Sequence, residues 1–131
     1  MKIVNDLPPF WDKIIKAGMN PDINKVVVTY GDIYYIPGGW VMPSHLVVHE
    51  LVHTRQQGNN PDSWWDKYLS DVDFRLFQEL EAYKEQYKFI CKKLKDRNKQ
   101  NLFLVDFARI LSGPTYGNSI TQKEAFERLR A

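Results

Sequence analysis

The sequence predicts an α+β fold in which a small antiparallel β-hairpin or sheet packs against a set of helices. Residues 25–39 are rich in β-branched and aromatic side chains on both sides of a turn, which is typical of a hairpin. The segments after them carry apolar residues at three- and four-residue steps, the period of an amphipathic helix. Strands and helices are thus segregated along the chain, which favours α+β over alternating α/β.

The bulk properties are those of one globular domain spanning residues 1–131, long enough to form a core without disulfides. The formal net charge of +2 gives no electrostatic reason to expect a nucleic acid or an anionic membrane as partner. Cys91 is the single cysteine, which excludes an internal disulfide and a cysteine-based zinc site. With no secretory signal and no apolar run long enough to span a bilayer, a cytoplasmic location is expected.

The first elements are a short helix and the hairpin. Residues 8–18, PPFWDKIIKAG, predict a helix with prolines at its start and Gly18 at its end. Residues 25–39, KVVVTYGDIYYIPGG, predict two strands that turn around residues 30–32 and end at Pro37 and the glycines after it.

A helix is then expected from Pro43–Ser44 to the breaker sequence GNNP at residues 58–61, with Ser44 as its N-cap. The next segment, DSWWDKYL at residues 62–69, predicts a polar–aromatic connection or a short helix. Its Trp64–Trp65 pair is expected in the core or in the wall of a cleft.

The remaining segments predict three further helices. The longest runs from about Phe74 to Lys95, and its apolar residues define one buried stripe. These residues are Leu76, Leu80, Tyr83, Tyr87, Ile90 and Leu94. Residues 101–111 predict another buried helix, and residues 121–130 predict a last one, in which Thr121 and Glu124 have the spacing of a capping box.

All three histidines of the chain lie four residues apart in SHLVVHELVHTRQQ, so on a helix they share one face. His49, Glu50 and His53 form the pattern H-E-x-x-H, in which two imidazoles can bind one metal ion and Glu50 can act as general base toward a metal-activated water. The alternative is a chance pattern on an ordinary amphipathic helix, in which these polar groups would be costly to bury without partners. We therefore predict a metal site, and zinc suits this donor set best.

A catalytic zinc site has three protein ligands. His45 lies about 12 Å from His53 along the helix axis, too far to share one ion, so it is expected to be an outer or substrate-facing residue, or an ordinary residue at the helix start. On a wheel centred on Leu76, Glu79 lies about 60° away at the flank of the stripe, whereas Glu81 lies about 140° away in solvent. Glu79 is the predicted third ligand, with a surface or structural carboxylate as the alternative reading.

The segment HELVHTRQQ, followed on the next long helix by ELEAY, resembles the gluzincin type of zinc metallopeptidase in its small minigluzincin and phage- or prophage-encoded forms. Those proteins carry H-E-x-x-H on one helix and E-x-x-A-[D/N/Y] on the next. The resemblance covers the central third of the chain. It implies a zincin-like domain in which His49, His53 and Glu79 bind Zn²⁺ and Glu50 is the catalytic base.

Two departures from that pattern concern residues near Glu79. Tyr83 follows Ala82 where larger membrane-bound relatives carry aspartate, and no second histidine follows to stabilise an oxyanion. Tyr116 in the loop SGPTYGNS and Tyr34 in the hairpin are candidate donors for that role. The alternative for Tyr116 is a loop anchor that packs its ring on the core.

The glutamines Gln56 and Gln57 also look like the phage-type pattern. Gln56 lies one turn beyond His53, where it is either a hydrogen-bond partner of the ligand or part of a polar helix end. In such peptidases an edge strand beside the zinc helix binds the substrate by strand addition, and residues 32–36, DIYYI, are the expected strand. The alternative is a sheet that only covers the helices.

The sequence thus predicts a zinc-dependent endopeptidase that acts on a peptide or protein substrate in the cytoplasm or, if phage-encoded, in the host cytoplasm or virion. One alternative is a non-catalytic, zinc-stabilised binding or virion-assembly protein. Another is an amidase or peptidoglycan hydrolase that uses the same site. Glu50 favours an enzyme, because a structural zinc site needs no base beside the metal.

Overall fold

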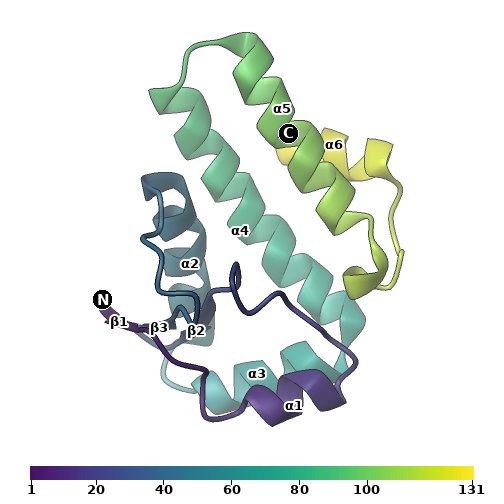
Figure 1. The fold of residues 1–131 in the computed structure, drawn as a ribbon. Coiled ribbons are helices and arrows are strands. Elements are labelled where there is room, and N and C mark those ends of the chain that lie inside the picture. Colours follow the sequence, from purple (N-terminus) through teal and green to yellow (C-terminus); the bar gives the residue numbers. More distant parts are fainter.

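The computed structural model describes residues 1–131 and has an α+β fold with six α-helices and one three-stranded sheet (Figure 1). The helices are α1 (Trp11–Lys16), α2 (Ser44–Gln57), α3 (Pro61–Ser70), α4 (Val72–Lys93), α5 (Arg97–Leu111) and α6 (Gln122–Arg130), with a 3₁₀ turn η1 (Pro114–Tyr116) before α6. The coarse class predicted from the sequence is confirmed.

The sheet contains the predicted hairpin and one strand that was not predicted. β2 (Val28–Tyr30) and β3 (Ile33–Tyr35) pair antiparallel, and Gly31 in the turn between them has a φ of 60°, a left-handed conformation that favours glycine. β1 (Lys2–Val4) pairs with the other side of β3 and runs parallel to it, so the sheet is mixed. The strand order is β1-β3-β2.

This order corrects the strand expected to bind a substrate. β3, within residues 32–36, lies in the centre of the sheet and both of its edges are already paired. A substrate strand therefore cannot add to it, and that prediction is wrong. The edge strand nearest α2 is β2, which also has the buried side chains Val28 and Thr29.

Helix α2 begins one residue earlier than the prediction of Ser44 as its N-cap implied. Pro43, with extended backbone (ψ 156°), is the N-cap, and Ser44 is the first helical residue. No side chain caps this end; the Pro43 carbonyl oxygen accepts from the backbone N–H groups of Leu46 and Val47. The prediction of Ser44 as N-cap is wrong, while the end of the helix before Gly58 is confirmed.

Short polar caps set the boundaries of α3 and α4. The Asn60 side chain accepts from Ser63 N–H at the start of α3, so the tryptophan-rich segment is a helix rather than a connection. The Asp71 side chain accepts from Phe74 N–H and begins α4 directly after α3 ends. Helix α4 therefore begins at Val72, two residues before the predicted start.

The main core lies between α4, α5, α6 and η1. The predicted stripe of α4 is confirmed: Leu76 and Ile90 are buried, and the other four stripe residues pack against the same cluster. The capping box of Thr121 and Glu124 is formed in full at the start of α6. Helix α4 lies between α2 and α5 in Figure 1, so one face contacts the core and another faces the histidine helix.

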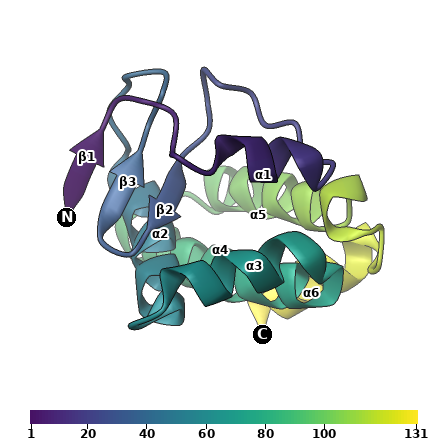
Figure 2. The ribbon, with the colours of Figure 1, turned by 90° about the horizontal axis from the view of Figure 1, so that it is seen from below.

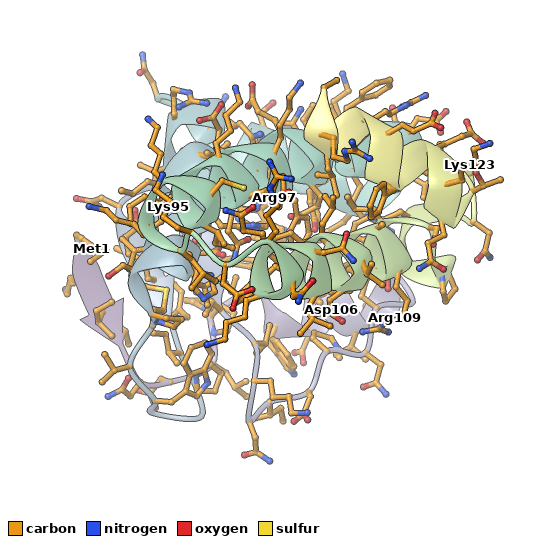
Figure 3. All side chains as sticks on the ribbon, turned by 90° about the horizontal axis from the view of Figure 1, so that it is seen from above. Met1, Lys95, Arg97, Asp106, Arg109 and Lys123 are labelled. Carbon is orange, nitrogen blue, oxygen red and sulfur yellow. The ribbon has the colours of Figure 1, made fainter.

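The surface carries charged side chains as well as exposed apolar ones such as Val41, Phe77 and Leu102. Figure 3 places Met1 and Lys123 at opposite ends of the molecule, with the exposed ion pair of Asp106 and Arg109 on α5. No helix combines the length and the hydropathy that crossing a membrane requires.

Candidate metal centre

The packing of α2 against α4 brings three donor atoms together. His49 and His53, one turn apart on α2, face Glu79 on α4. Glu79 Oε1 lies 3.1 Å from His49 Nε2 and 3.1 Å from His53 Nε2, and the two Nε2 atoms are 3.2 Å apart. The three side chains are 5 to 7% exposed, so the wheel argument placed Glu79 on the correct face.

This triangle has the dimensions of a metal site. A tetrahedral zinc ion with bonds of about 2.0–2.1 Å separates its ligands by about 3.3–3.4 Å, close to the three distances observed. The buried group of His49, Glu50 and His53, whose donor atoms lie within 4.8 Å of one another, can hold a metal ion. Of the two carboxylates, Glu79 contacts both rings, whereas the closest ion-pair contact of Glu50 is 3.8 Å, to His49. Two neutral imidazoles and a carboxylate also suit other divalent ions.

Glu81, the alternative carboxylate on α4, points away from this group. Its side chain is 52% exposed, and its Oε1 atom accepts from Gln56 and lies 3.7 Å from Arg55. Its position in solvent agrees with the sequence prediction.

Glu50 lies beside the triangle with one oxygen occupied and one not. Thr29 Oγ1, on β2, donates to Glu50 Oε1 at 2.9 Å. The other oxygen, Oε2, is the one that faces His49 Nε2. Since Thr29 and Glu50 are both buried, the edge strand fixes the carboxylate and leaves Oε2 for another partner.

Glu79 is anchored on both of its oxygens. While Oε1 contacts the histidines, Oε2 accepts a 2.5 Å hydrogen bond from the Tyr68 hydroxyl on α3. Burial alone would raise the pKa of Glu79, but the two histidines outweigh it by charge and hydrogen bonding and hold that pKa well below its usual value. The carboxylate is therefore ionised at neutral pH, as a metal ligand must be.

His53 is oriented by a neutral amide. Gln56 Nε2 donates to the Gln78 carbonyl oxygen and to Glu81, so Gln56 Oε1 faces His53 Nδ1 at 2.8 Å, and Nδ1 must donate to it. The Nε2 atom of His53 then points to Glu79. Burial lowers the pKa of His53, but the charge of Glu79 prevails and raises it to about 9 in the metal-free protein. Of the two roles that the sequence left open for Gln56, the structure shows the hydrogen bond to His53.

His49 is linked to the third histidine through a residue that the sequence did not single out. Gln86, on α4 and 2% exposed, lies with Oε1 2.9 Å from His49 Nδ1 and with Nε2 2.8 Å from His45 Nδ1. Burial and the neighbouring His49 lower the pKa of His45 below its usual value. His45 is therefore an outer residue of the centre and not a fourth donor to it.

The donors open into a cavity of about 300 Å³. Its walls come from β2, α1, α2, α3, α4 and η1, and apolar residues make up more than half of its 19 lining residues. Figure 2 shows α1 and the strands on one side of α3 and α4. Trp64 and Trp65 line the cavity, as the reading of a cleft wall predicted.

The structure separates the two tyrosines proposed as donors. Tyr116 is packed in the core and also lines the cavity, whereas Tyr34 is 1% exposed and belongs to the small cluster beneath the sheet. The Thr54 hydroxyl donates to the Gly31 carbonyl, so the Tyr34 hydroxyl donates to Thr54 at 2.5 Å and is not available at the site. The sequence placed Tyr83 in the stripe of α4 but gave it no role at the site, where its ring lies edge-on to His49 with 4.5 Å between centroids and also lines the cavity.

Gln57, the second glutamine of the pair, joins α2 to the hairpin. Its amide donates to the Thr29 carbonyl oxygen at 2.8 Å and accepts from Gly31 N–H at 2.6 Å. Trp65 Nε1 donates to the same Thr29 oxygen. The end of α2 therefore holds the strand that positions Glu50.

Comparisons with known proteins do not add to this geometry, because no protein-family model, no curated protein and no solved structure matches the chain.

Proposed function

We propose that the protein is a zinc-dependent metallopeptidase of the gluzincin type with a zincin-like core. In this proposal His49, His53 and Glu79 bind Zn²⁺ and Glu50 is the general base. The observation that carries the proposal is a triangle of three buried donor atoms beside a carboxylate with one unoccupied oxygen, all lining one cavity. A structural zinc site, by contrast, is closed by four protein ligands.

The bound ion would polarise the scissile carbonyl and lower the pKa of the attacking water. Glu50 Oε2 accepts the proton of that water and then donates it to the leaving amine, so the carboxylate is regenerated at each turnover. Thr29 keeps the Glu50 carboxylate in place through Oε1 during both transfers. Glu50, His49 and His53 come from one stretch of α2 and Glu79 comes from α4, and all four residues line the same cavity.

Two tyrosines that line the cavity, Tyr83 and Tyr116, are candidates to stabilise the negative charge that develops on the carbonyl oxygen. Burial is the main cause that raises the pKa of both Tyr83 and Tyr116 above the ordinary value, and the negative charge of Glu79 raises it further. Both phenols therefore remain protonated and can donate. Tyr68 is not a third candidate, because its hydroxyl already donates to Glu79. An aligned donor in a water-poor site is worth about 10²–10³-fold in rate.

The walls of the cavity suggest how a substrate would bind. β2 is an edge strand, and the chain from Lys25 to Thr29 lines the cavity, so an extended peptide can pair with it. The Thr29 carbonyl is occupied by Gln57 and Trp65, and the N–H groups of Lys25 and Val26 donate to the Asp22 carbonyl oxygen, which leaves Val27 as the position for pairing. The apolar walls favour an uncharged side chain next to the scissile bond.

The first prediction tests the general base. In the zinc-loaded protein, Glu50→Gln should retain metal content and fold, and should lower cleavage of an unbiased peptide library by about 10²–10⁴-fold. Cleavage is followed by mass spectrometry and zinc by elemental analysis. Glu85→Gln, an exposed acid on α4 that pairs with Lys88, is the matched control and should cleave normally.

Full activity of Glu50→Gln would contradict the assignment of the base. A wild-type protein that binds zinc tightly but cleaves no member of the library would contradict the peptidase proposal. That result would favour the zinc-stabilised binding protein, or an amidase for another substrate.

A further inference from the structure

We propose that Gln86 and His45 form a positioning pair that holds His49 in the tautomer and orientation required for metal binding. The inference rests on the proposed metal site, but it concerns two residues that do not contact the ion. It also explains why the third histidine of the row lies one turn before the metal-binding pair.

The chain of contacts runs from His45 through Gln86 to His49. Gln86 Nε2 is 2.8 Å from His45 Nδ1, and Gln86 Oε1 is 2.9 Å from His49 Nδ1. Gln86 is 2% exposed, so water does not compete for either end of its amide. The amide therefore bridges two rings on α2 from its buried position on α4.

The chemistry of the amide fixes the protons along this chain. An amide oxygen only accepts and an amide nitrogen only donates. If His49 binds a metal through Nε2, its proton is on Nδ1, and Gln86 must present its oxygen there. The Gln86 NH₂ group then faces His45, which must accept on an unprotonated Nδ1 and carry its proton on Nε2.

The opposite arrangement is incompatible with ligation. If His45 carried its proton on Nδ1, the amide would have to turn its oxygen toward His45 and its NH₂ toward His49. His49 would then accept on Nδ1 and carry its proton on Nε2, among the three donor atoms. His45 and His49 are therefore coupled through Gln86 even though they share no hydrogen bond.

His45 is held in its place by aromatic packing. Its ring lies edge-on to Phe103 of α5, with 5.2 Å between centroids. Phe103 contacts Phe107, Phe107 contacts Tyr83, and Tyr83 contacts His49. Together with the two hydrogen bonds of Gln86, this row of rings connects His45 and His49 by a second route, which runs through α5.

Gln56 contacts His53 in the same way that Gln86 contacts His49, so the two glutamines can be compared. The Gln56 NH₂ group is fixed by a backbone carbonyl and by Glu81, so the orientation of its oxygen toward His53 does not depend on a third titratable ring. Gln86 has no such partner and takes its orientation from His45. The two histidine ligands are thus positioned by the same kind of group in two different ways.

The first test measures zinc affinity by competition with a chelator. Gln86→Leu should weaken zinc binding by about 10–100-fold, the usual effect of losing a hydrogen-bond partner of a ligating histidine. Gln86→Glu keeps an acceptor for His49 and should lose less. Gln100→Leu, which removes an amide that contacts only the Leu94 carbonyl, is the control and should bind zinc normally. Normal affinity of Gln86→Leu would overturn the proposal.

The second test measures coupling. His45→Leu should weaken zinc binding on its own but add nothing in a Gln86→Leu background, because the pair acts as a unit. His45→Gln, which offers a carbonyl oxygen to the Gln86 NH₂ group, should restore most of the lost affinity. Losses that add in the double variant would overturn the pair, as would a His45→Leu protein with unchanged affinity. Because His45 is only partly buried, the His45→Leu and His45→Gln variants still test the proposal if Gln86→Leu does not fold.

The third test observes the proton itself. In the zinc-loaded protein, NMR of the imidazole nitrogens should show His45 with its proton on Nε2 and an unprotonated Nδ1. A His45 with its proton on Nδ1 would overturn the proposal. All three readouts require zinc but no substrate, so a protein that binds zinc and cleaves nothing would refute the proposed function while leaving this inference standing.

Discussion

Each donor atom of the candidate centre is oriented by another side chain. Gln56 and Gln86 contact the Nδ1 atoms of the two histidines, and Tyr68 contacts the far oxygen of Glu79. Such partners limit rotation of the rings and of the carboxylate, so the three atoms stand close together before any ion is present. The geometry of the candidate centre therefore depends on Gln56, Gln86 and Tyr68 as well as on the three donor residues.

One prediction at this scale compares the two glutamates of α4. Glu79→Gln replaces a proposed ligand and should weaken zinc binding by more than the roughly 10–100-fold typical of an outer partner. Glu81→Gln should change the affinity much less, because this residue contacts Gln56 and solvent. Competition with a chelating dye measures both. The reverse ranking would show that the wrong glutamate has been chosen.

A second prediction concerns the pH dependence of the metal-free protein. Since the pKa of His53 is raised from 6.5 to about 9, its contribution to the free energy of unfolding is complete below pH 6.5 and is lost as the pH rises through about 9. The contribution of Glu79, whose pKa is lowered, is present above pH 4.5 and is lost on acidification below it.

The chelator-treated protein should therefore lose on the order of 3 kcal/mol of stability between pH 6.5 and 9. Urea unfolding at a series of pH values measures this loss. Glu79→Gln, which removes the partner of His53, is the control and should show a much flatter profile. An equal slope in both proteins would contradict the assignment.

At the scale of the element, α2 is organised by two faces. One face carries the histidines toward α4, and the other carries Thr54 and Gln57 toward the turn of the hairpin. Glu50 lies between them and contacts Thr29 of β2. A single helix thus sets the distance between Glu50, the proposed base, and the two histidines, and the hairpin holds the Glu50 carboxylate.

The prediction at this scale concerns the end of α2. Gln57→Leu should destabilise the protein by about 1–3 kcal/mol, because the partly buried Gly31 N–H and the buried Thr29 carbonyl oxygen both lose their hydrogen bond to the Gln57 side chain. Zinc affinity should be unchanged, since Gln57 contacts none of the donors. Denaturant unfolding measures the loss, and Gln122→Leu on the exposed face of α6 is a control expected within about 0.5 kcal/mol of wild type. An unchanged Gln57→Leu protein would contradict this role.

The elements also show what could be predicted from the sequence. The stripe of α4 and the capping box of α6 follow from local spacing, and the position of Glu79 follows from its angle to that stripe. β1 could not be predicted, because it is three residues long and pairs with a strand distant in the chain. Because β1 was not predicted, β3 was expected to be an edge strand of the sheet, whereas it is the central one.

Gln86 was missed for a related physical reason. In the sequence it is one polar residue among many on a helix, and its role depends on where α4 crosses α2. Spacing within one helix gives the direction of a side chain but not the neighbour it meets. The contact with His45 is visible only when both helices are placed.

At the scale of the whole molecule, Arg75 connects parts that are distant in the sequence. Its buried guanidinium donates to the carbonyl oxygens of Tyr68, Leu69 and Thr115. These bonds join the end of α3 to η1, and both segments line the cavity. The positions of α3 and η1 in the cavity wall therefore both depend on the buried Arg75.

The prediction at this scale is stabilisation by metal. Zinc that binds only the folded chain should raise the free energy of unfolding by about 4 kcal/mol when free zinc is a thousandfold above Kd. Thermal unfolding with zinc and with excess chelator measures the shift. Glu79→Gln should show a smaller shift at the same zinc concentration, and an equal melting temperature with and without zinc in the wild type would argue against a folded-state site.

The uncharged character of Gln56 and Gln86 has a consequence for the valence of the ion. In the proposed metal centre, the carboxylates of Glu50 and Glu79 would balance the charge of a dication, and the two uncharged amides would not change that balance. A monovalent or trivalent cation would leave a net charge in a dehydrated interior, which is energetically costly. The two carboxylates, with neutral partners around the histidines, would therefore favour a divalent cation.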